Sequence, residues 1–126
     1  MKQELIDIYK ACCNGICPPI RIIIYDNLDV FYHKDSPCKG QKQISLTKKF
    51  KINLDALNQI IQLINDSDFW NLEDEYILTP VDLQKITITI NYIDLRKTIT
   101  ITQGLQVPIE LNNLILGIEK IISEFG

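Results

Sequence analysis

The sequence is poor in the residues on which many enzymes and nucleic-acid-binding proteins depend. Its 126 residues include one histidine, His33, and only two arginines, Arg21 and Arg96. Any Ser–His or Cys–His mechanism would therefore have to use His33. The chain also lacks the Gly-x-Ser-x-Gly, Gly-x-Gly-x-x-Gly and P-loop motifs of common hydrolases and nucleotide-binding proteins. We therefore predict no catalytic residue and no cofactor.

Long apolar runs are also missing. No stretch approaches the roughly 20 apolar residues that a membrane-spanning helix needs. Residues 1–10 are polar and mixed, unlike a signal peptide. We expect no membrane contact, and a cytoplasmic location if Met1 is the native start. If an export signal was trimmed from the chain, a periplasmic or exported location is expected instead.

The remaining composition is that of a globular protein. The hydrophobic fraction is 46%, and a chain of this length is large enough to bury a core without disulfides or metals. The sequence shows no repeat, low-complexity tract or linker. We predict a single domain over residues 1–126.

Alternating side chains predict most of the sheet. Apolar and polar residues, mostly isoleucine and threonine, alternate strictly in residues 86–92 and 98–102, as expected for strands with one buried face. Further strands are predicted at residues 5–13, 21–25 and 28–32, with a short one at 43–46. Asp26-Asn27 tolerates the positive φ of a tight hairpin, and residues 94–96 are predicted to form a second turn.

Helical spacing predicts two helices. The first begins after an N-cap at Asn53, has an apolar stripe, and ends at residues 65–68. The second begins at Pro108, which suits a first helical position. The two stripes are Leu54, Leu57, Ile61 and Ile64, and Leu111, Leu114, Ile115, Ile118, Ile122 and Phe125. The fold class is α+β: an antiparallel sheet of about five or six strands with two helices packed on one face.

Two further features are predicted to be structural. Trp70, which follows Phe69 after the first helix, is expected to belong to the core. Cys13 and Cys17 flank a loop punctuated by Gly15, and we expect them to be structural thiols. The spacing leaves open whether they form a disulfide, which a reducing cytosol disfavours.

The same cysteines also allow a functional interpretation. Cys13, Cys17, His33 and Cys38 are residue types that bind zinc, but their spacing matches no standard zinc signature. We therefore predict no metal site. A thiol-redox or hydrolytic enzyme that uses the Cys13/Cys17 loop is the alternative function.

Charge is distributed unevenly along the chain. Residues 33–52 hold six lysines against one aspartate, whereas residues 66–82 hold six acidic residues and no base. Such asymmetry can mark a surface that contacts a partner. The small number of arginines and the net charge of −3 argue against a dedicated nucleic-acid binder.

The acidic stretch contains the candidate binding residues Glu73, Glu75, Tyr76 and Asp82. Pro80 interrupts any helix between Tyr76 and Asp82, so the chain bends there and can bring the two side chains together. An aspartate in such a loop can accept backbone amide hydrogen bonds. We expect this loop to be either a structural staple or the surface that faces a partner.

The order of these signatures resembles a bacterial family known only as a domain of unknown function. The resemblance rests on Cys-x-Gly-x-Cys-Pro at residues 13–18, the following hairpin, and a Phe-x-x-Leu-x-x-x-Tyr segment at 69–76. Asp82 looks like the acidic residue that follows this tyrosine in the family. The hairpin departs from the family pattern, because Asp26-Asn27 replaces its usual Asp-Gly. The family implies no activity.

The main functional hypothesis is therefore a small, non-catalytic binding or interaction domain with a protein partner. An immunity-type protein that neutralises a toxin is one specific version, since small acidic domains suit that role. The oligomeric state is left open.

Overall fold

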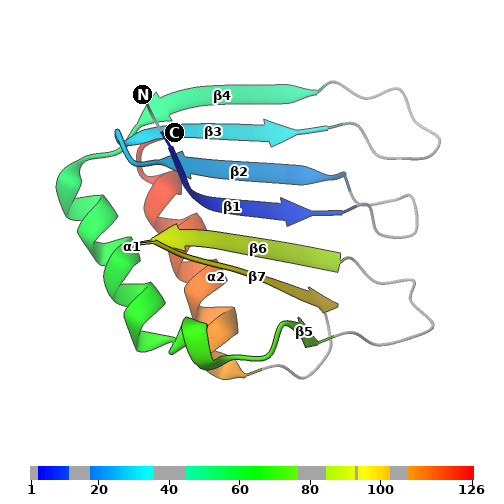
Figure 1. Cartoon of the computed structure of the whole chain (residues 1–126). Coiled ribbons are helices and arrows are strands. Elements are labelled where there is room, and N and C mark those ends of the chain that lie inside the picture. The colour runs from blue at the N-terminus through cyan, green and yellow to red at the C-terminus, as the bar shows by residue number, and fades with distance from the viewer. Residues whose placement is uncertain (1–2, 12–17, 36–44, 77–84, 93, 103–107) are drawn as a thin grey trace.

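A seven-stranded sheet organises the part of the chain that the structure describes (Figure 1). The computed structural model describes residues 3–11, 18–35, 45–76, 85–92, 94–102 and 108–126. The strands are β1 Glu4–Lys10, β2 Ile20–Tyr25, β3 Asp29–Lys34, β4 Leu46–Lys51, β5 Glu75–Tyr76, β6 Lys85–Tyr92 and β7 Leu95–Thr102. The helices are α1 Leu54–Asp66 and α2 Ile109–Ser123, with a short 3-10 helix, η1, at Phe69–Asn71.

The sheet order is β4-β3-β2-β1-β6-β7-β5. Every pair is antiparallel except β5 and β7, which are parallel. The α+β class with two helices is thus confirmed, whereas the predicted count of five or six strands and a wholly antiparallel sheet were wrong. The additional parallel strand, β5, has only two residues, too few to show an alternating pattern.

Isoleucine forms the centre of one sheet face. Ile8 lies opposite Ile22 on β2 and Ile88 on β6, and all three are at most 1% exposed. The buried residues of both helices join the same hydrophobic cluster. Both helices therefore pack on this face, as Figure 1 shows. Burial of each such side chain stabilises the fold by about 1.5–3 kcal/mol.

The helix boundaries follow local signals. Asn53 caps α1, because its Oδ1 accepts a hydrogen bond from the Ala56 amide at 2.8 Å. The predicted end at residues 65–68 is also confirmed, with Ser67 as C-cap. Two members of the predicted apolar stripes are exposed: Leu54 is 62% exposed, and Phe125, which was expected to be buried, is 36% exposed. Both lie at helix ends, where helical spacing continues but the packing partner does not.

The first hairpin turns differently from the prediction. Positive φ occurs at Leu28, at 76°, and not at Asp26 or Asn27. The Leu28 amide donates to the Tyr25 carbonyl at 3.1 Å, which fits a three-residue loop whose last residue is left-handed. The Leu28 side chain packs against the core, and its carbonyl accepts from the Ile52 amide. These tertiary contacts offset the backbone strain that leucine has in this region.

Two strand boundaries were also misplaced. The short strand was predicted at residues 43–46, of which 43 and 44 lie outside the described residues, whereas β4 covers Leu46–Lys51. A largely exposed edge strand has little apolar alternation by which to recognise it. The second hairpin is tighter than expected. Leu95 and Arg96 already pair with Tyr92 and Asn91 within the sheet.

The helices cover only part of the core face. Seven strands about 4.8 Å apart span about 29 Å, whereas two helices about 10 Å across cover about 20 Å. The part of the core face that the helices leave uncovered lies at β4. There, Leu46 on the core side is 46% exposed and Phe50 is only half-buried.

Candidate functional site

The acidic segment Glu73, Asp74 and Glu75 lies at the β5 edge of the sheet, and all three residues are exposed. Glu75 and Tyr76 form β5, which pairs with Thr100 and Ile101 of β7. The Tyr76 hydroxyl oxygen accepts a hydrogen bond from the Glu73 amide at 3.1 Å. Tyr76 therefore closes the segment on itself, as a structural staple does.

Lys97 fixes the backbone just before the acidic segment. Its ammonium group donates to the Trp70 carbonyl at 3.1 Å and to the Leu72 carbonyl, and lies 3.8 Å from the Asp74 carboxylate. The Lys97 side chain is only 16% exposed. A lysine so placed needs hydrogen-bond acceptors, and the carbonyls in and just after η1 supply them.

Lys97 was not predicted from the sequence, although its spacing carries a signal. Lys97 is in phase with Ile99 and Ile101 along β7 and lies opposite Ile90 on β6. A lysine in step with two core isoleucines must have its charge satisfied by the fold. That pattern distinguishes it from an ordinary surface lysine.

The structure thus brings together three of the four predicted binding residues: Glu73, Glu75 and Tyr76. Asp82 lies outside the described residues, and so does its expected contact with Tyr76. Cys13 and Cys17 lie outside them too, together with the other two cysteines.

The two aromatic residues that precede the acidic segment differ in how deeply they are buried. Phe69 is fully buried and Trp70 is half-buried against the core, with the two rings edge to face at 5.4 Å. Trp70 therefore belongs to the periphery of the core, whereas Phe69 lies at its centre. Neighbouring residues in a 3-10 turn point in different directions, so only one of the two rings can reach the centre.

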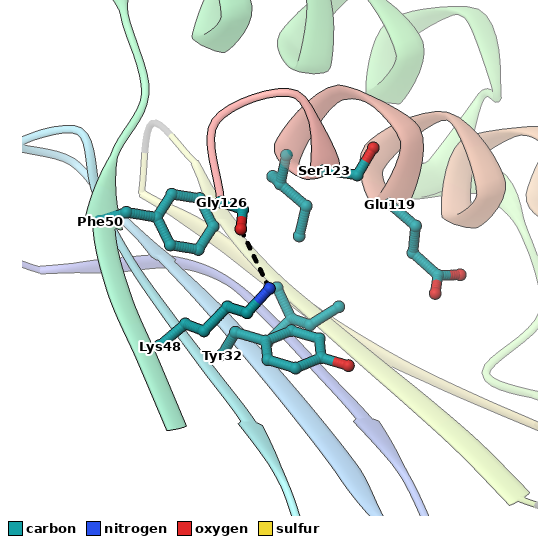
Figure 2. Close-up of a pocket in the computed structure, with 8 residues that line it drawn as sticks. Tyr32, Lys48, Phe50, Glu119, Ser123 and Gly126 are labelled. Carbon is teal, nitrogen blue, oxygen red and sulfur yellow. Dashed lines mark hydrogen bonds between the residues drawn. The ribbon is translucent and has the colours of Figure 1, made fainter. Parts of the chain in front are cut away.

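A second candidate site is a hollow at the opposite side of the molecule, called here the α2–β4 groove. Its volume is about 290 Å³. Its floor comes from β2, β3 and β4 and its wall from the C-terminal part of α2 (Figure 2). The lining residues are Ile22, Tyr32, Lys48, Phe50, Glu119, Ile122, Ser123 and Gly126.

Two lysines define the polar contacts of this groove. The Lys48 ammonium group donates to the Gly126 main-chain oxygen at 3.0 Å and lies 5.9 Å above the centre of the Tyr32 ring. The Lys10 ammonium group, at the margin, contacts both Glu119 carboxylate oxygens at 2.9 and 3.0 Å. Figure 2 shows Lys48 reaching toward Gly126, with Glu119 on the other side of the hollow.

The sheet face away from the helices carries a third set of contacts. Arg21 makes two hydrogen bonds to the Asp7 carboxylate, at 3.1 and 3.0 Å, and its guanidinium lies 5.3 Å from the centre of the Tyr9 ring. The hydrogen bond to Asp7 is the main cause that raises the pKa of Arg21. His33 Nδ1 lies 2.7 Å from Thr47 Oγ1, so the histidine has a hydrogen-bond partner on the neighbouring strand.

Within the described ranges, no group of three or more His, Cys, Asp or Glu residues could hold a metal ion. No helix in the described part of the chain has the length and apolar character needed to span a membrane.

Comparison with known proteins identifies a family. No curated protein matches the chain. A family model described as a domain of unknown function, DUF6438, matches residues 4–122, a span that runs from the first residue of β1 nearly to the end of α2. This match confirms the resemblance to a domain of unknown function, and the chain belongs to the DUF6438 family.

Proposed function

We propose that this chain is a binding domain without catalytic activity, that its partner is a protein, and that the acidic segment Glu73–Asp74–Glu75 contacts that partner. The observation that carries the proposal is the support of this segment. Three consecutive exposed acidic residues follow directly on a backbone that Lys97 fixes at Trp70 and Leu72, and the Glu73 amide donates to the Tyr76 hydroxyl.

A fixed backbone matters because ordering a loop costs free energy when a partner binds. A segment that is held in place before binding avoids part of that cost. Among the described residues, neither Glu73 nor Glu75 takes part in an ion pair. Both carboxylates are thus available to a basic partner surface, where complementary charge speeds association and favours the correct partner.

An immunity-type role is the specific form of this proposal. A toxin that acts on nucleic acid has a basic active-site surface, and a rigid acidic edge is complementary to such a surface. A toxin gene beside the gene for this chain would identify the protein to test.

The experiment measures binding of that neighbouring gene product by calorimetry. Glu73→Lys/Glu75→Lys is expected to weaken binding at least about tenfold, with the melting temperature unchanged. Glu4→Lys/Glu124→Lys is the matched control, because it changes the net charge equally at two exposed positions outside the acidic segment. Equal affinity of the two variants would contradict the role of the acidic segment.

A further inference from the structure

We draw no further inference here: the strongest candidate, the α2–β4 groove at the β4 side of the sheet, carries none, because its two charged side chains, Lys48 and Glu119, already contact the Gly126 main-chain oxygen and Lys10, and nothing in the structure shows what occupies it.

Discussion

The two edge strands of the sheet, β4 and β5, are protected from pairing with another chain in different ways. An edge strand leaves backbone groups unpaired and can recruit another chain. β4 has six residues and carries three lysines, whereas β5 has two residues and lies within an acidic segment. The first edge is protected by positive charge and the second by its short length.

The two edges also differ in the packing on the helix-covered face of the sheet. Beside β4 the helical layer ends and leaves the α2–β4 groove. At β5 the chain is secured by η1, by Lys97 and by the core residue Phe69. We infer that the β5 edge depends on tertiary contacts for its shape, while β4 depends mainly on its pairing with β3. Substitutions on the two sides therefore test this difference directly.

Phe69→Ala should have the largest effect. The side chain is fully buried and anchors the segment that leads to β5. Its loss should reduce the free energy of unfolding by about 3–5 kcal/mol, measured by urea denaturation. Trp70→Ala should cost less, because that ring is only half-buried. An equal or larger loss for Trp70 would show that it supports the β5 edge more than Phe69 does.

Lys97→Met should follow. The substitution keeps much of the apolar stem but leaves the Trp70 and Leu72 carbonyls without their donor. Because an unsatisfied buried polar group costs about 1–3 kcal/mol, we expect a loss in that range, together with faster amide exchange at β5. Lys49→Met on β4 is the control and should change stability by less than about 0.5 kcal/mol. If exchange at β5 stays slow, Lys97 does not hold the acidic segment.

Asn53→Ala tests the junction where β4 leads into α1. The substitution removes the side-chain oxygen that caps the Ala56 amide. The expected loss is about 1 kcal/mol, measured by thermal unfolding. Asn53→Asp retains the acceptor and should be nearly neutral, so equal losses in both variants would argue against the cap as the cause.

Lys49→Val should have the smallest effect on stability and the clearest effect on association. Valine suits a strand, so the melting temperature should stay nearly constant. Removing the charge from an exposed edge should promote pairing between copies, seen as a concentration-dependent mass in sedimentation. A strictly monomeric variant would show that lysine at this position does not protect the edge.

The sequence anticipated those parts of the site that depend on local patterns. Glu73, Glu75 and Tyr76 stand close together in the chain, so their proximity in the structure needed no long-range contact. Lys97 was missed because its partners, the carbonyls of Trp70 and Leu72, are far from it in sequence. The α2–β4 groove was missed because it combines residues from three strands and a helix.

By itself, the sequence determined the two helices, the Ile/Thr strands and the face that each of them buries. These features follow from the side-chain periods of 3.6 and 2 residues and from caps such as Asn53. Only the tertiary structure decided the strand order, the parallel β5 pairing and the position of the groove. These depend on which segments meet in space, and on two helices being narrower than the seven-stranded sheet they cover. No local sequence pattern encodes this difference in width between the helical layer and the sheet, because it arises only when the two layers pack together.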